Sequence, residues 1–132
     1  RDGKVDKSHV FVQEKGLVSP LGISVFGNKI VVSQPPELIV YTDVDCNLVF
    51  DPKVDKREVI LTGFNGRNHD HSLHAVIPGP DGKWYLNQGN CGAVFKDNSG
   101  KKFSITSSYS GGYNPRDWPQ NPMRNAGKKK DN

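Results

Sequence analysis

Histidine side chains, which carry protons or bind metals near neutral pH, are concentrated in one short stretch of this sequence. Three of the four histidines lie there, at His69, His71 and His74, and Asp70 separates the first two. In an extended chain, His69 and His71 project to one side and His74 projects to the other. Asp70 is then within reach of a neighbouring imidazole, which it can orient.

Three interpretations of the histidine stretch are open from the residues alone. In the first, it is a polar loop whose imidazoles form hydrogen bonds with backbone groups. In the second, one histidine is a catalytic base that removes a proton from an alcohol while a hydride leaves to a cofactor. In the third, His69 and His71 are paired ligands of a transition metal.

A second group of residues suited to chemistry is acidic. Asp43, Asp45 and Asn47 place oxygen-bearing side chains at alternate positions, and Asp51 and Asp55 follow. Alternating oxygen ligands are how a short loop wraps Ca²⁺. A complete calcium loop also has a glycine at its sharp turn, where this chain has leucine. The segment is therefore interpreted either as a calcium site or as a turn whose carboxylates bond their own backbone.

The elements that must position these residues recur along the chain. The segment Lys29–Gln34 recurs 54 positions later as Lys83–Gln88, and Leu38–Asp43 corresponds to Gly92–Asp97 at the same offset. Lys4–Lys7 recurs as Lys53–Lys56. A period of roughly 40–50 residues made of short β-runs is typical of propeller blades.

Alternating apolar residues and turn residues predict strands throughout, and no window carries a helical period. Gly27-Asn28 and Asp81-Gly82 suit tight hairpin turns because these residues tolerate positive φ. The expected strands are 8–12, 21–26, 29–33, 37–42, 57–62, 73–77, 83–87, 92–96 and 102–106.

We therefore predict an all-β fold built from antiparallel four-stranded blades of a β-propeller. Residues 1–106 form the partial propeller, with the end of one blade first, then one whole blade at 21–62 and most of the next at 73–106. Residues 107–132, interrupted by several prolines, are an irregular loop or insertion. Closed propellers need about 4–8 blades, and this chain holds about two. We expect it to be a piece that docks on the remainder of the propeller or on neighbouring chains.

Composition excludes some classes of partner. The net charge is +4, and Lys128-Lys129-Lys130 supply much of that excess. Aromatic residues are not interleaved with basic ones as a base-stacking surface requires, so we expect no nucleic acid. No apolar run approaches the length of a membrane span. Cys46 and Cys91 fit no metal or haem motif, and free thiols or a disulfide between blades both stay open.

Several segments of the sequence together resemble a known family. They occur in order at Tyr41–Asp45, Asp55–Phe64, His69–His74 and Gly79–Asn90. These residues closely resemble the membrane-bound dehydrogenase domain of Planctomycetes and Verrucomicrobia, which belongs with the six-bladed propellers similar to glucose/sorbosone dehydrogenases. The resemblance covers about residues 5–96. Its acidic turn usually reads Asp-x-Asp-x-Asp-Gly, from which Asn47 and Leu48 depart.

The resemblance implies a periplasmic or cell-surface protein, often joined to a c-type cytochrome domain. It implies pyrroloquinoline quinone (PQQ) as the hydride acceptor and Ca²⁺ as its partner. In the sugar dehydrogenases the base precedes a strand and a Gly-Pro-Asp turn. His71 takes that place here, and Asp70 or His74 would orient it.

The expected function follows from this resemblance. The parent protein would be a quinoprotein-like dehydrogenase that oxidises a sugar or related alcohol by hydride transfer to a quinone, and the chain alone would be inactive. The alternative is a non-catalytic β-propeller that binds carbohydrate or protein, or that forms a structural part of a larger assembly.

Overall fold

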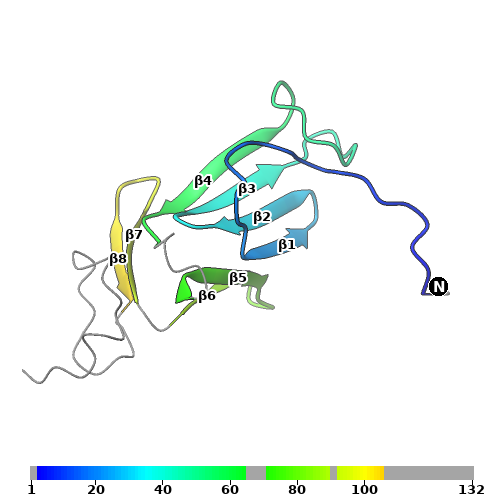
Figure 1. The fold of residues 1–132 in the computed structure, drawn as a ribbon. Coiled ribbons are helices and arrows are strands. Elements are labelled where there is room, and N and C mark those ends of the chain that lie inside the picture. Colours follow the sequence, from blue (N-terminus) through cyan, green and yellow to red (C-terminus); the bar gives the residue numbers. More distant parts are fainter. Residues whose placement is uncertain (1–2, 65–70, 90–91, 106–132) are drawn as a thin grey trace, which may run out of the picture.

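The computed structural model describes residues 3–64, 71–89 and 92–105, and these form an all-β protein (Figure 1). Every strand pair among them is antiparallel, which confirms the predicted all-β fold with antiparallel sheets. The described segments contain no helix long and apolar enough to cross a membrane. The strands are β1 (Gly22–Phe26), β2 (Lys29–Gln34), β3 (Glu37–Thr42), β4 (Lys56–Thr62), β5 (Leu73–Pro78), β6 (Trp84–Gln88), β7 (Ala93–Asp97) and β8 (Lys102–Ile105).

The first unit, strands β1–β4, is a continuous antiparallel meander. Its first hairpin turns at Gly27, which has a φ of 61°, and Asn28. The Asn28 side-chain amide donates a 2.9 Å hydrogen bond to the Asp43 carbonyl, and the Asp43 N–H donates to the Asn28 carbonyl at 2.9 Å. These bonds join the β1–β2 turn to the end of β3. The four strands expected between residues 21 and 62 are all present.

The second unit, strands β5–β8, consists of two hairpins. The β5–β6 hairpin is a separate two-stranded sheet, and β7–β8 joins the first unit through a short pairing of β7 with the end of β4. Among the described residues no ladder joins β6 to β7. All four expected strands exist, but their union into one four-stranded blade stays a prediction. The segment 107–132 lies outside the described residues.

Residues 8–12 do not form a strand, and the prediction of one there was wrong. A strand needs a neighbouring strand for its backbone hydrogen bonds. The backbone bond that the structure gives this segment runs from the Phe50 N–H to the Phe11 carbonyl, at 2.9 Å. The segment instead crosses a face of the first unit, where the Phe11 ring lies edge-on to Tyr41, with 6.4 Å between ring centroids.

The sheet of the first unit is apolar on both faces, because successive side chains of a strand point to opposite sides. Val31, Leu38 and Val40 point to one face and pack against Phe64, strand β5 and strand β7. Val32, Ile39 and Tyr41 point to the other face, which residues 9–17 cross. We call residues 9–17 the strap, because they run over this second face (Figure 1).

A polar lock holds the strap on the sheet. The Tyr41 hydroxyl donates to Glu14 Oε1 at 2.8 Å, and the Arg57 guanidinium donates to both Glu14 carboxylate oxygens at 2.9–3.1 Å. The hydrogen bonds from Arg57 hold the pKa of the Glu14 carboxyl below its ordinary value. Burial, together with the bond to Glu14, raises the pKa of Tyr41 to about 12.

The lock predicts an acid-dependent loss of stability. Folding lowers the pKa of Glu14 below its value in the unfolded chain, about 4.3. Glu14 therefore makes its full contribution to the free energy of unfolding above that pH. The contribution is lost as the pH falls through the lowered pKa of the folded state. We expect Glu14→Gln to reduce the free energy of unfolding at pH 7. Between pH 5 and about pH 3, the free energy of unfolding of this variant should decrease less than that of the wild type. Urea unfolding over this range measures both effects.

Glu58→Gln is the matched control, since Glu58 is an exposed carboxylate on β4 beside Arg57. Glu58→Gln should follow the acid profile of the wild type. A Glu14→Gln profile that is parallel to the wild type at every pH would contradict the role given to Glu14.

Candidate functional site

His71 lies directly before β5, and its backbone is held by the end of β6. The Gln88 side-chain amide donates a 2.5 Å hydrogen bond to the His71 carbonyl. The Gly89 N–H donates to the carbonyl of Ser72 at 3.1 Å. His71 is half-buried, as is His74 within β5. The hairpin thus fixes the backbone that carries the expected catalytic base.

Gly89 allows this close approach. A Cβ placed on Gly89 would lie 2.5 Å from the His71 carbonyl carbon and equally close to its oxygen. Real Cβ atoms do not come that near to other backbone atoms, so only glycine lets the two ends of the hairpin meet. We call Gln88 and Gly89 the clamp on His71.

Two buried polar atoms lie next to the clamp. Ser72 Oγ and Gln88 Oε1 have no hydrogen-bond partner among the described residues. Buried polar atoms are normally paired, so these two are exceptions in the immediate neighbourhood of the His71 backbone. Sequence reasoning missed both. The recurrence of glutamine at the ends of β2 and β6, Gln34 and Gln88, could have pointed to the second.

The structure brings β5 against β1. The Ser24 hydroxyl donates to the Val76 carbonyl, and Gly22 lies against the backbone of His74 and Ala75, where a Cβ would overlap it. The first strands of the two units are therefore neighbours (Figure 1). The other members of the histidine stretch, His69 and Asp70, lie outside the described residues. The pairing of His69 with His71 and the orientation of His71 by Asp70 stay predictions.

The acidic loop between β3 and β4 brings together Asp43, Asp45 and Asp55, and one carboxylate oxygen from each lies within 4.8 Å of the other two. Asp43 and Asp55 are buried and Asp45 is exposed. Asn47, the third residue expected at a calcium site, uses its side-chain oxygen to accept the Val49 N–H at 2.8 Å. Sequence spacing alone did not group Asp55 with the first two.

Backbone N–H groups satisfy the buried carboxylates of the acidic loop. Asp43 accepts hydrogen bonds from Asn47 and Leu48, at 3.2 and 2.9 Å. Asp55 accepts from Val44 and Asp51, at 2.8 and 2.7 Å. These bonds agree with the interpretation of the segment as a turn whose carboxylates bond their own backbone. The three carboxylates also offer the hard oxygen ligands that Ca²⁺ binds.

The acidic loop and His71 are separate sites. In Figure 1 the loop projects from the end of the first unit that is far from the start of β5. A cation held by the loop therefore does not reach the histidine. Cys46, also in this loop, is an exposed free thiol, and Cys91 lies outside the described residues.

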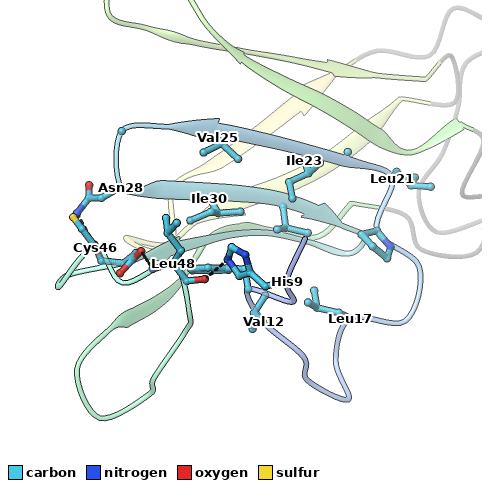
Figure 2. Close-up of a pocket in the computed structure, with 16 residues that line it drawn as sticks. His9, Val12, Leu17, Leu21, Ile23, Val25, Asn28, Ile30, Cys46 and Leu48 are labelled. Atoms are coloured by element: carbon cyan, nitrogen blue, oxygen red, sulfur yellow. Dashed lines mark hydrogen bonds between the residues drawn. The ribbon is translucent and has the colours of Figure 1, made fainter. Parts of the chain in front are cut away.

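An apolar groove of about 710 Å³ opens on the strap side of β1 and β2. Figure 2 shows Ile23, Val25 and Ile30 along the strands, facing His9, Val12 and Leu17 of the N-terminal segment. His9 Nε2 is bonded to the Leu48 carbonyl at 2.8 Å, which closes one side of the groove. Sequence analysis did not predict this groove, because it arises where the strap crosses the sheet.

The clamp predicts that Gly89 is intolerant of a side chain. Gly89→Ala should lower the free energy of unfolding by about 1–3 kcal/mol, because the added Cβ overlaps the His71 backbone. Gly16→Ala is the control, since its Cβ would meet only Glu14 Oε1 at an ordinary 3.5 Å. Denaturant unfolding measures the cost, and NMR shifts of the Ser72 and Leu73 amides report displacement of β5. Equal stability of the two variants would refute the clamp.

The comparisons with known proteins give a family but no function. Searches of curated proteins and of solved structures returned no match. The model of a family described as a domain of unknown function, DUF7133, matches residues 1–120. Because this match covers most of the 132 residues, the chain belongs to the DUF7133 family.

Proposed function

We propose that this chain contributes two blades to a β-propeller dehydrogenase that oxidises a sugar or related alcohol, with His71 as the catalytic base. The observation that carries the proposal is the position of His71. It lies half-buried at the start of β5, on a backbone fixed by the clamp, where β5 runs beside β1.

The packing of the two units supports the propeller. Each unit begins with a strand that contacts the first strand of the other, and the apolar face of one unit covers the other. In a propeller, the first strands of neighbouring blades surround the central channel. A residue that precedes such a strand, as His71 does, then faces the channel entrance.

The proposed role of His71 is proton removal. A neutral imidazole accepts the proton of the substrate hydroxyl as the carbon that bears it loses a hydride. Bound PQQ would supply the acceptor for that hydride. Gln88 and Gly89 act only by holding the His71 backbone. Asp70 or His74 would orient the imidazole ring.

The residues that would hold PQQ are not those that contact His71 here. The quinone carries carboxylates, for which cationic side chains such as arginine are the strongest partners. Ser72, Gln88 and Gly89, the described neighbours of the His71 backbone, are uncharged. The quinone, a c-type cytochrome partner and a periplasmic or cell-surface location are supported by the family resemblance alone.

Calcium fits the acidic loop by the chemistry of its donors. Asp43, Asp45 and Asp55 would hold it through hard carboxylate oxygens, and two of the three are buried like charges that a cation would neutralise. A cation there would order the loop between β3 and β4. Because the loop is remote from His71, this Ca²⁺ would not act on the reacting atoms.

A second candidate function is favoured by a different observation. The chain exposes apolar side chains on β1, β5 and β6, at Ile23, Val25, Ile77 and Tyr85. Exposed apolar patches mark interaction surfaces. A non-catalytic propeller that binds carbohydrate or protein, or that is a structural part of an assembly, is therefore the alternative.

The catalytic proposal predicts that His71→Ala strongly reduces turnover. We expect sugar-dependent dye reduction by the protein that carries this segment, reconstituted with PQQ and Ca²⁺, to fall about 10²–10⁴-fold. His9→Ala is the control, because His9 is hydrogen-bonded to the Leu48 carbonyl of the β3–β4 loop, which is remote from the start of β5 (Figure 1). The isolated 132-residue chain should show no turnover.

Each contrary result has a distinct meaning. Reduction that survives His71→Ala excludes this residue as the base. The absence of both quinone binding and turnover over a panel of sugars and alcohols favours the binding or structural alternative. Transition-metal binding that His71→Ala removes would support the metal interpretation of His69 and His71 instead.

The calcium proposal predicts a stabilisation specific to the loop. Ca²⁺ should raise the unfolding temperature of the chain, because it binds only the folded loop. Asp55→Asn should remove this shift, whereas Asp81→Asn, in an exposed turn elsewhere, should keep it. Thermal unfolding of each variant, with Ca²⁺ and with a chelator, measures the shift in unfolding temperature. An equal shift in both variants would exclude Asp55 as a ligand.

A further inference from the structure

A pocket of about 420 Å³ opens beside the turn that joins β2 to β3. One wall is formed by Gln34, Glu37 and the Pro35-Pro36 turn between them, and the other by Val18 and Ser19 of the segment that precedes β1. The volume lies within the usual range of ligand pockets, about 300–1,000 Å³. The pocket shares no residue with the clamp on His71 or with the acidic loop.

The Gln34 side chain is buried in this wall, and a hydrogen bond fixes its orientation. The Ser19 N–H donates to Gln34 Oε1 at 3.1 Å, so the oxygen end of the amide faces Ser19. The nitrogen end carries two hydrogens. Among the described residues its acceptor is the Pro35 carbonyl at 3.4 Å, beyond the usual range of about 2.7–3.2 Å. Gln34 therefore brings an underused donor to the pocket.

Glu37 places an acceptor next to this donor. Gln34 and Glu37 are directly opposite each other in the β2–β3 ladder, and side chains at such positions lie on the same face of a sheet. Glu37 is half-buried, and its carboxylate has no hydrogen-bond or ion-pair partner within the described residues. The two prolines of the turn have fixed φ angles, so the donor and the acceptor are presented by a stiff backbone.

The two groups together fit a ligand with adjacent hydroxyls. A hydroxyl both donates and accepts, so one hydroxyl can donate to the Glu37 carboxylate while its neighbour accepts from Gln34 Nε2. A ligand ammonium group would satisfy the carboxylate but would leave the Gln34 amide without an acceptor. Val18 and the prolines add an apolar wall for the C–H face of a ring. This is the chemistry of a sugar or a cyclic polyol.

The pocket lies at the same edge of the fold as His71. Gly22 of β1 lies against the backbone of His74, and Ser24 bonds the Val76 carbonyl further along β5. The two strands therefore run in the same direction, and the segments that precede them lie at one edge (Figure 1). Further blades of a propeller would pack on the faces of these sheets, whereas loops at strand ends are where ligands bind.

The sequence repeat relates the pocket to the clamp. Gln34 and Gln88 are equivalent at the offset of 54 positions (88 minus 34). Each glutamine bonds the backbone of the segment before the first strand of its own unit, Gln34 at Ser19 and Gln88 at His71. In the first unit, Ser19 thus takes the place that His71 takes in the second.

We propose that the pocket between Ser19, Gln34 and Glu37 binds a sugar or cyclic polyol through two adjacent hydroxyls. The Glu37 carboxylate accepts from one hydroxyl, and Gln34 Nε2 donates to the next. The bound hydroxyls belong to a part of the substrate that does not react, a statement that rests on the proposed dehydrogenase. The binding itself rests on the pocket alone.

Titration of the isotope-labelled chain with glucose, followed by NMR, tests the pocket. The side-chain amide of Gln34 and the backbone amide of Glu37 should shift and saturate, whereas the amides of β8 should not move. Cyclohexanol, a ring of similar size with a single hydroxyl, should give no saturable shift, because it cannot satisfy both groups.

Glu37→Gln should weaken glucose binding about tenfold, because a hydrogen bond to a charged group is replaced by a neutral one. The variant should stay folded, since Glu37 has no partner to lose within the described residues, and the amide spectrum checks this. Glu58→Gln, which removes an exposed carboxylate of β4, is the control and should bind like the wild type.

Kinetics of the protein that carries this segment link the pocket to the reaction. Glu37→Gln should raise KM for the sugar by a similar factor and should lower kcat less, because it removes binding away from the reacting bond. His71→Ala should act mainly on kcat. The two variants therefore separate the pocket from the candidate base.

The two proposals fail in different ways. If glucose gives no saturable shift at Gln34 and Glu37, or binds Glu37→Gln as tightly as the wild type, the pocket is excluded, even in a protein that oxidises sugars through His71. If glucose binding depends on Glu37 in a protein without turnover, the pocket is supported and the dehydrogenase is contradicted.

Discussion

The sheet of the first unit is apolar on both sides, and most of the structure follows from the need to cover both. One apolar face carries Val31, Leu38 and Val40, and the other carries the alternate residues of the same strands. Each face must be shielded from water by another part of the chain. A sheet left with an open apolar face loses the main favourable contribution to folding. The second unit covers one side, and the strap covers part of the other.

The two covers differ in their physics. The second unit packs through aromatic side chains, with Phe64 stacked on Phe95 at 4.5 Å between centroids. The strap is short and is held by a partly exposed ionic lock, Glu14 with Arg57 and Tyr41. Exposed ion pairs contribute little, so the strap is the weaker cover. Its length and course determine that the groove opens over β1 and β2.

The same packing positions the candidate site. Because β5 lies against β1, His71 is brought to the edge where the two units meet, and the clamp from β6 fixes its backbone. The acidic loop is independent of this contact, since its carboxylates are held by backbone N–H groups of the loop itself. The candidate base and the candidate cation site therefore depend on different parts of the fold.

The sequence by itself determined the strands, because alternation and turn residues such as Gly27-Asn28 act within a few residues of one another. The recurrence of Lys29–Gln34 as Lys83–Gln88 also predicted a strand at each of these places, and the structure has β2 and β6 there. Only the tertiary structure decided that residues 8–12 cross the sheet without forming a strand, that Asp55 joins Asp43, and that Gln88 holds His71. These contacts join residues far apart in the chain, so they depend on how the units pack and leave no local pattern in the sequence.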